Sequence, residues 1–203
     1  MIVALVLVPI AYLIGTLPTA QLVAARRGHD PLAEGSGNPG ATNVARLAGW
    51  RAGVIVLAGD FAKGVVPTAV GLAVAGRAAG FALGIAAVVG HVLPLTRRLR
   101  GGRGVASSAG VILVLFPLLT LAAAVVYLTV ARLTHTASVA SLVIAVTFPA
   151  AVALVGAPWP EVAALVALGL LVIVRHVPNL RRLVRGRELG LRPGSVPADE
   201  EDA

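Results

Sequence analysis

The sequence predicts an all-α, polytopic membrane protein with about seven transmembrane helices, its N-terminus outside and its C-terminus in the cytoplasm. Its 203 residues are 58% hydrophobic and only 13% charged, whereas a soluble domain is nearer half apolar and a quarter charged. One soluble core of this length cannot bury so much apolar surface, and a disordered chain carries far less of it. Apolar runs of membrane-spanning length, separated by arginine-rich segments, complete the argument.

Six apolar runs are long enough to consider as spans, since a helix crosses the hydrocarbon layer with about 20 residues. They cover residues 1–25, 52–76, 78–96, 105–131, 137–156 and 160–174. The first run lacks a basic leader, and its apolar stretch of about 24 residues exceeds the length of a signal-peptide core. We therefore expect an uncleaved first transmembrane helix.

Basic residues gather in three segments beside these runs, around residues 26–51, 97–103 and 175–192. The positive-inside rule places all three in the cytoplasm, so the chain between them at 104–175 must cross the membrane an even number of times. Pro117 lies near the centre of the run 105–131, where it removes a helix hydrogen bond. We therefore predict a hairpin of two short helices, 105–116 and 118–131. A single long span, with one false span elsewhere, is the alternative.

Residues 1–192 are expected to form one transmembrane domain, followed by a disordered acidic tail at 193–203. The net charge of +8 does not indicate nucleic-acid binding, because charged and aromatic residues are too few for a soluble basic face. The absence of cysteine excludes disulfides, zinc–thiolate sites and thiol nucleophiles. The four histidines, His29, His91, His135 and His176, show no metal-ligand spacing, so no metal or other cofactor is expected.

The first polar segment, residues 34–46, is rich in glycine and short polar side chains. Its glycines fit a GxGxxG pattern, but a transmembrane helix precedes it instead of a strand, so we reject a dinucleotide site. Glycines still allow successive backbone N–H groups to converge on an anion, and Arg46 can donate two hydrogen bonds to a phosphate. An ordinary glycine- and asparagine-rich turn is the alternative. The cradle would use Ser36, Gly37, Asn38, Gly40, Thr42 and Asn43.

Two further cytoplasmic segments carry polar side chains. In residues 90–108, His91 ends an apolar run, and Gly101, Gly102 and Gly104 bracket Arg103 at the start of the next helix, which predicts another anion cradle. A basic stop-transfer loop would explain the neighbouring arginines but not these glycines. In residues 175–188, Arg175 and His176 close the last span, and a short amphipathic extension follows with Asn179, Arg182 and Glu188.

The spans themselves contain few polar groups. Asp60 and Lys63 are three residues apart and share one helix face, so we predict an ion pair that faces the bundle interior. Each charge costs about 2.5–3.5 kcal/mol near mid-bilayer, and a structural pair and a direct substrate contact remain alternatives. Ser138 and Ser141 are placed to face one cavity. Anion cradles on one membrane face, without a thiol or a metal cluster, indicate phosphate-bearing substrates met at the lipid surface.

These motifs resemble those of the bacterial integral-membrane, acyl-phosphate-dependent glycerol-3-phosphate acyltransferases. Residues 35–46 resemble GSGNxGATNxxR, 60–64 DFxKG, 90–107 GHxxP…GGKGVAT, 138–141 SxAS and 175–188 RHxxNxxRLxxGxE, in order along nearly the whole chain. The resemblance implies seven transmembrane helices, no metal or nucleotide cofactor, and acyl transfer from acyl phosphate to the 1-hydroxyl of glycerol 3-phosphate. It implies an active site at Ser36, Arg46, Ser141, His176 and Asn179, a cradle for acyl phosphate at 37–40, and His91 in polar support.

The chain departs from the family pattern at two positions: Arg103 replaces a lysine and Ser107 a threonine. Arginine keeps the charge but changes the donor geometry, so a divergent paralogue with low activity or another acceptor is a rival hypothesis. A phosphate or lipid transporter is less favoured, because no halves repeat. We expect a multi-pass protein of the bacterial cytoplasmic membrane, with lipid, acyl phosphate and glycerol 3-phosphate as partners and the site on the cytoplasmic face. The expected catalytic residues are Ser36, Arg46, Arg103, His176 and Asn179. The expected substrate-binding residues are Gly37, Asn38, Gly40, Thr42, Asn43, Lys63, His91, Gly101, Gly102, Gly104, Ser141 and Arg175.

Overall fold

The computed structural model describes residues 2–191, and all the regular secondary structure in that range is helical. The acidic tail predicted at 193–203 lies outside the described residues. The helices are α1 (Ile2–Gly15), α2 (Thr19–Ala25), α3 (Ala41–Ala48), α4 (Trp50–Ala75), α5 (Arg77–Val92), α6 (Val105–Leu115), α7 (Pro117–Thr134), α8 (Ala137–Leu154), α9 (Trp159–Arg175) and α10 (Val177–Val184), with a 3-10 turn at Leu95–Arg97. The prediction of an all-α membrane protein is confirmed.

Five helical segments within the described residues are long and apolar enough to cross a membrane. They are Val6–Ala25, Trp50–Ala75, Arg77–Arg97, Pro117–Thr134 and Ala137–Leu154. α9 with α10 is a sixth, bent by 54° between the two helices, and α6 is a shorter apolar helix. α6 would be a seventh apolar segment, so the predicted number of about seven spans stays a prediction.

The predicted break in the run 105–131 is confirmed. α6 ends at Leu115 and α7 begins at Pro117, and Phe116 between them has a non-helical backbone with φ −140° and ψ 63°. Proline suits the first position of a helix, because its missing N–H has no partner there in any case. The long apolar run is therefore two helices that meet at a sharp turn.

The expected first transmembrane segment is present as the candidate span Val6–Ala25, but its helix is interrupted between α1 and α2. α1 ends at Gly15 and α2 begins at Thr19, and Pro18 precedes it. A proline disfavours the helical conformation of the residue before it. The glycine-rich segment also differs from the prediction, because its second half forms the helix α3.

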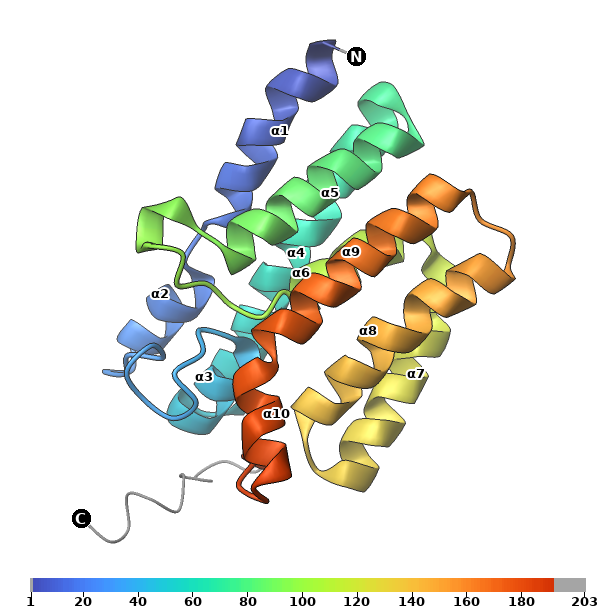
Figure 1. Cartoon of the computed structure of the whole chain (residues 1–203). Helices are drawn as coiled ribbons and strands as arrows, with labels where there is room; N and C mark the ends of the chain where they lie inside the picture. Colours follow the sequence, from blue (N-terminus) through green and yellow to red (C-terminus); the bar gives the residue numbers. More distant parts are fainter. Residues whose placement is uncertain (1, 192–203) are drawn as a thin grey trace, which may run out of the picture.

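Close helix packing holds the bundle together. α4 packs against α5 and α6, and α1 packs against α5. A Cβ at Gly64 would run into the Ser107 carbonyl, and one at Gly15 into the Ala87 carbonyl, so these positions need glycine for backbone-to-backbone approach. In Figure 1, α7 and α8 form a pair on one side, α9 crosses the front, and α3 and α10 lie at the end opposite the start of α1.

Arg77 joins three helix ends on the side of the bundle away from α3 and α10. Its Nε and Nη2 bind Glu161 at 2.6 and 2.9 Å, and its Nη1 donates to the Leu115 carbonyl at 3.0 Å. The guanidinium also lies 4.6 Å from the centre of the Phe116 ring. Arg77 therefore donates a hydrogen bond to a carbonyl that the break at Phe116 would otherwise leave without a partner.

Replacing Arg77 by alanine should destabilise the protein without changing its chemistry. We expect a loss of about 2 kcal/mol in unfolding free energy, from the charged hydrogen bonds and the ring contact. Thermal unfolding in detergent measures the loss. The stability of Arg77→Lys should lie between those of the wild type and Arg77→Ala, because lysine keeps the charge but not the paired donors. A reduced kcat of the folded Arg77→Ala protein would contradict this purely structural role.

Candidate active site

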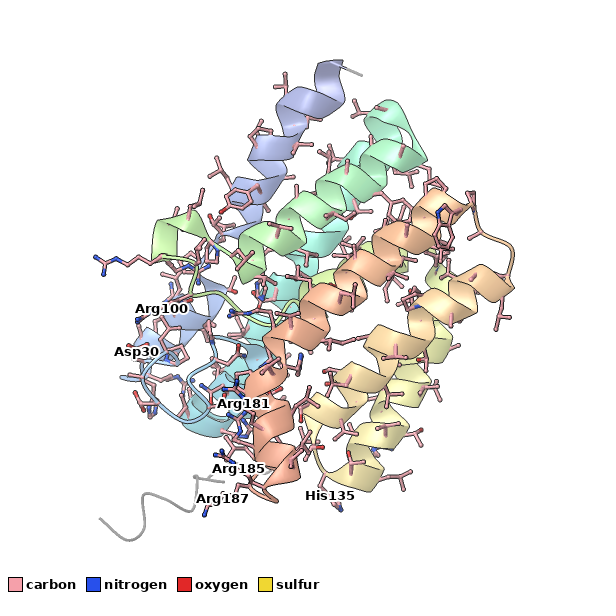
Figure 2. The ribbon with its side chains drawn as sticks, in the orientation of Figure 1. Asp30, Arg100, His135, Arg181, Arg185 and Arg187 are labelled. Atoms are coloured by element: carbon pink, nitrogen blue, oxygen red, sulfur yellow. The ribbon has the colours of Figure 1, made fainter. Side chains whose placement is uncertain are left out.

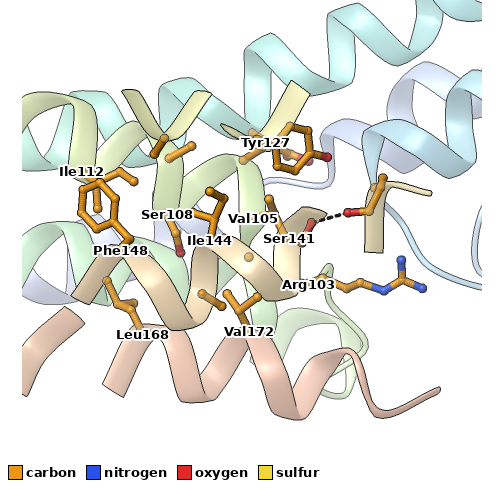
Figure 3. Close-up of a pocket in the computed structure, with 18 of the residues that line it drawn as sticks. Arg103, Val105, Ser108, Ile112, Tyr127, Ser141, Ile144, Phe148, Leu168 and Val172 are labelled. Atoms are coloured by element: carbon orange, nitrogen blue, oxygen red, sulfur yellow. Dashed lines mark hydrogen bonds between the residues drawn. The ribbon is translucent and has the colours of Figure 1, made fainter. Parts of the chain in front are cut away.

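A largely apolar cavity of about 480 Å³ runs into the bundle from the end that carries α3 and α10. Figure 3 shows Arg103 at one end of it, Ser141 and Tyr127 further along, and Ile112, Phe148 and Leu168 at the other end. The walls come from α4, α6, α7, α8 and α9. The cavity therefore joins a cationic group to a slot lined by aliphatic and aromatic side chains.

The first glycine segment is a turn built around Asn43 at the start of α3. The Asn43 Oδ1 accepts the Ser36 N–H at 2.9 Å, and its Nδ2 donates to the carbonyls of Pro31 and Glu34 at 3.1 and 3.0 Å. Gly35 and Gly37 adopt φ values of 61° and 64°, which favour glycine. The side-chain hydrogen bonds of Asn43 therefore hold the loop in its shape. Asn43 does not line the cavity, as a substrate-binding residue would.

Glu34 ties the same loop to the chain before it. Its carboxylate accepts the Asp30 N–H at 2.6 Å and lies 2.7 Å from His29 Nδ1. The backbone hydrogen bond, followed by the bond to His29, lowers the pKa of Glu34. The Ser36 hydroxyl is buried and has no hydrogen-bond partner among the described residues. The hydroxyl therefore keeps its hydrogen-bonding capacity, although Ser36 lines neither pocket.

The second glycine segment packs directly on α5 and α9. The Gly102 N–H donates to the His91 carbonyl at 3.1 Å, and Arg175 donates to the carbonyls of Gly101 and Gly102 at 2.8 and 3.3 Å. Arg175 therefore supports the loop, and these two guanidinium nitrogens are not free to bind a ligand. The loop leads Arg103 and Gly104 to the cavity at the start of α6.

Burial of Arg103 lowers the pKa of its guanidinium to about 10, with the nearby Arg182 acting in the same direction and Glu188 against it. The side chain stays cationic at neutral pH. Burial likewise lowers the pKa of Arg46, against the effect of Glu188. Arg46, Arg103, Arg175 and Arg182 therefore form one cationic group, and Glu188 is the acid that acts on it within residues 2–191. In Figure 2 the labelled Arg181, Arg185 and Arg187 gather at the end of the bundle that carries α10.

Arg46 does not line the cavity, and instead it holds the chain after α10. Its Nε donates to the Gly190 carbonyl at 2.9 Å and its Nη2 to the Leu189 carbonyl at 3.1 Å. These two bonds use one edge of the guanidinium and leave the Nη1 side for an anion. The structure thus shows how Arg46 is oriented and not a phosphate contact.

His176 and Asn179 lie at the bend between α9 and α10. The His176 Nδ1 is 2.8 Å from the Val172 carbonyl. Because a carbonyl only accepts hydrogen bonds, Nδ1 carries the proton and Nε2 presents a lone pair. Glu188 binds Asn179 Nδ2 at 2.5 Å and Arg182 Nε at 2.9 Å. Asn179 Oδ1 and Arg182 Nη2 are buried and have no partner in residues 2–191.

The predicted residues separate into three sets. The cavity is lined by Asn38, Gly40, Thr42, His91, Arg103, Gly104, Ser141 and His176. A smaller pocket of about 250 Å³, between the two glycine loops, is lined by Gly37, Gly101 and Arg175 among others. Neither is lined by Ser36, Asn43, Arg46, Lys63, Gly102 or Asn179.

Sequence reasoning missed three polar residues in the cavity wall, Ser108, Thr120 and Tyr127. Ser108 lies one turn into α6 and has a buried hydroxyl without a partner among the described residues, and Tyr127 of α7 interacts with Ser141. Their signal was weak, because a lone serine, threonine or tyrosine in an apolar helix is common. Ser138, expected to share a cavity with Ser141, does so. No group of three or more His, Asp or Glu side chains within 2–191 is arranged to hold a metal ion.

Comparison with known proteins identifies the family. The family model described as glycerol-3-phosphate acyltransferase matches residues 5–186. The chain belongs to this family.

Relatives and solved structures agree with this membership. The glycerol-3-phosphate acyltransferase of Pseudomonas fluorescens (strain Pf0-1) is 42% identical over 187 residues, which are 88% of this chain and 95% of that protein. The same enzyme of Geobacter sulfurreducens is 38% identical over 190 residues, or 91% and 95%. The crystal structure of PlsY (YgiH), an integral membrane glycerol 3-phosphate acyltransferase in its glycerol 3-phosphate form, matches with a TM-score of 0.88 at 34% identity. It covers 92% of this chain and 94% of that one. Its lysophosphatidic acid form matches with a TM-score of 0.85 at 33% identity.

Proposed function

We propose that this glycerol-3-phosphate acyltransferase takes its acyl group from acyl phosphate and transfers it to the 1-hydroxyl of glycerol 3-phosphate. The products are lysophosphatidic acid and inorganic phosphate. The observation that carries the proposal is the cavity, which joins the cationic Arg103 and the His176 imidazole to a long apolar slot. Such a shape suits a donor with a phosphate head and a fatty tail. The glycerol 3-phosphate and lysophosphatidic acid forms of PlsY support the acceptor and the product.

In the proposed reaction, the acceptor hydroxyl attacks the acyl carbon directly. The new ester C–O bond forms as the bond between the acyl carbon and the phosphate oxygen breaks, and phosphate leaves with the bonding electrons. Arg46, Arg103 and the N–H groups of the glycine loops stabilise the charge that develops on the phosphate. Ser36 and Asn179 orient the acceptor. The hydroxyl proton passes to His176 Nε2 or to a substrate phosphate oxygen.

The apolar slot receives the acyl chain, and the site faces the cytoplasm. The slot is lined by exposed residues of α4 and α7, including Leu57 and Leu128, so it reaches the lipid between these helices. The arginine-rich segments lie with the glycine loops at one end of the bundle, and positive charge favours the cytoplasmic side. The acyl chain can therefore enter from the bilayer while its phosphate meets the arginines.

Donor choice tests the proposal. The purified protein should release phosphate and form lysophosphatidic acid from acyl phosphate and glycerol 3-phosphate. Acyl-CoA in place of acyl phosphate should give no product. Activity with acyl-CoA alone, or no activity with any acyl donor, would refute the donor assignment. A covalent acyl adduct that disappears in Ser36→Ala would refute direct attack in favour of an acyl-enzyme.

Replacing Arg103 by lysine should preserve or raise turnover at neutral pH, because both side chains bring a positive charge to the cavity. The pH profile should nevertheless change. In the wild type the pKa of Arg103 is about 10, so activity that needs this cation falls as the pH rises through that value. Lysine starts from a lower ordinary pKa of about 10.4, and the same burial moves the alkaline limb to lower pH.

The rates of the two proteins between neutral pH and pH 10 measure the shift. A large loss of activity at neutral pH in Arg103→Lys would contradict the expectation. It would show that the guanidinium geometry is a specialisation of this chain, as in a paralogue with another acceptor.

A further inference from the structure

The break in the first span is bonded to a buried ammonium group. The α1–α2 break leaves the Leu17 carbonyl outside a regular helix, and Lys63 of α4 donates to it at 2.7 Å. Lys63 also donates to the Thr19 hydroxyl at 2.9 Å and to Asp60 Oδ1 at 2.6 Å. The Thr19 hydroxyl in turn donates to Asp60. All three donor positions of the ammonium are therefore used.

The two charged side chains of this network are almost completely buried. Asp60 is 2% exposed and Lys63 is 4% exposed. Lys63 does not line either pocket, which favours the structural ion pair over a direct substrate contact. Two charges buried at this depth are held only by good mutual geometry, and here that geometry includes the backbone of the α1–α2 break.

The same break is bonded to the loop that carries Arg103. Arg97 donates to the Thr16 carbonyl at 2.9 Å and to Gln21 Oε1 at 3.1 Å. The Tyr12 hydroxyl donates to the Leu93 carbonyl at 2.8 Å and accepts the Leu95 N–H at 2.9 Å. The beginning of the loop therefore rests on the end of α1 and the start of α2.

A second route leads to the end of the loop. Asp60 Oδ1 lies 3.6 Å from His91 Nδ1, and the His91 carbonyl accepts the Gly102 N–H at 3.1 Å. A Cβ at Gly102 would run into the His91 ring, so the ring packs tightly on the backbone just before Arg103. Thr19 and Lys63 thus fix Asp60, Asp60 lies against His91, and His91 supports Gly102.

We propose that Thr19 and Lys63 are positioning residues that set the place of Arg103 for acyl transfer, through Asp60, His91 and Gly102. The inference rests on the proposed function for its kinetic test. Neither side chain lines the cavity, whereas Asp60 and His91 do, so changing Thr19 or Lys63 reaches the reaction through Asp60, His91 and the loop that they support. The broken first span is, on this view, the support on which the Arg103 loop is built.

The kinetic test uses Thr19→Val, which keeps the shape but removes the hydroxyl, with Thr19→Ser as the conservative variant. Displacing a positioned group by a small distance costs up to about 100-fold in rate. We expect Thr19→Val to lower kcat about 10- to 100-fold with little change in KM for acyl phosphate, whose tail binds elsewhere. Thr19→Ser should restore the rate. Arg77→Ala is the matched control, because it breaks an interhelical ion pair away from the loop.

A double mutant distinguishes a positioning role of Thr19 from a general loss of stability. In Gly101→Ala the loop is already displaced, so adding Thr19→Val should reduce kcat by much less than it does alone. Fully additive effects would overturn the proposal. A Thr19→Val protein with normal kcat but reduced thermal stability would also overturn it. An inactive wild type would instead count against the proposed function.

Hydrogen exchange tests the same inference without turnover. Backbone amides of residues 97–104 should exchange faster in Thr19→Val and in Lys63→Met than in the wild type, and Thr19→Ser should match the wild type. Arg77→Ala should leave these amides unchanged. Equal exchange of this loop in the wild type and in the Thr19→Val protein would overturn the inference, whatever the activity of either.

Discussion

Arg46→Ala should abolish acyl transfer, with kcat/KM reduced about a thousandfold, as for the loss of a main transition-state donor. The variant removes a positive charge from the cationic group at the cavity mouth. It also leaves the carbonyls of Leu189 and Gly190 without their donor. Phosphate release from acyl phosphate, measured on protein of verified folding, gives the result.

Two further variants help to interpret the loss of acyl transfer in Arg46→Ala. Arg46→Lys keeps the charge but cannot donate to both carbonyls and to a phosphate at once, so it should recover only part of the rate. Arg51→Ala is the control, because Arg51 is exposed at the start of α4 and contacts only the Trp50 ring among the interactions described. A rate within a few-fold of the wild type in Arg46→Ala would remove Arg46 from the catalytic set.

Gly101→Ala should reduce kcat/KM about 100-fold, the size expected for a displaced catalytic loop. A Cβ on Gly101 would run into the carbonyl oxygens of His91 and Val92. Because these atoms belong to the α5 backbone and its end, they cannot turn away as a side chain would. The loop must move instead, and Arg103 moves with it.

The matched control is Gly76→Ala, at the turn between α4 and α5. A Cβ there meets nothing within 4 Å, although its φ of 79° carries backbone strain. It should lower stability slightly and leave kcat/KM unchanged. Equal activity of the Gly101→Ala protein and the wild type would show that the loop has more freedom than its packing on His91 indicates.

The sequence predicted those features that depend on local chemistry. The break before Pro117, the buried pair of Asp60 and Lys63, and the amphipathic helix after His176 follow from proline geometry, charge burial and helix periodicity. The membership of His91, Arg103 and His176 in one cavity followed from motif order and resemblance. Each of these depends on residues that are close in sequence or on a recognised pattern.

Other features depend on contacts between distant segments, which the sequence does not show. Pro18 ends a helical segment, whereas Pro67 and Pro149 lie inside α4 and α8, because packing in a bundle satisfies the backbone groups that such prolines leave open. Arg46 meets the carbonyls of residues more than 140 positions away. α3 was missed because its glycine- and asparagine-rich start is typical of a turn, although an apolar face follows.

Short α6 has a consequence for where in the membrane the reaction takes place. Its 11 residues span about 16 Å, and its far end is fastened to Arg77 at the other side of the bundle. The hydrocarbon layer is about 30 Å thick, so the Arg103 end of α6 lies well below the level of the lipid headgroups. In the proposed reaction, acyl phosphate would therefore meet Arg103 without leaving the bilayer. Glycerol 3-phosphate, the small and doubly charged acceptor of the proposed reaction, would have to come down to Arg103 from the headgroup level, over a distance that grows with the thickness of the surrounding lipid.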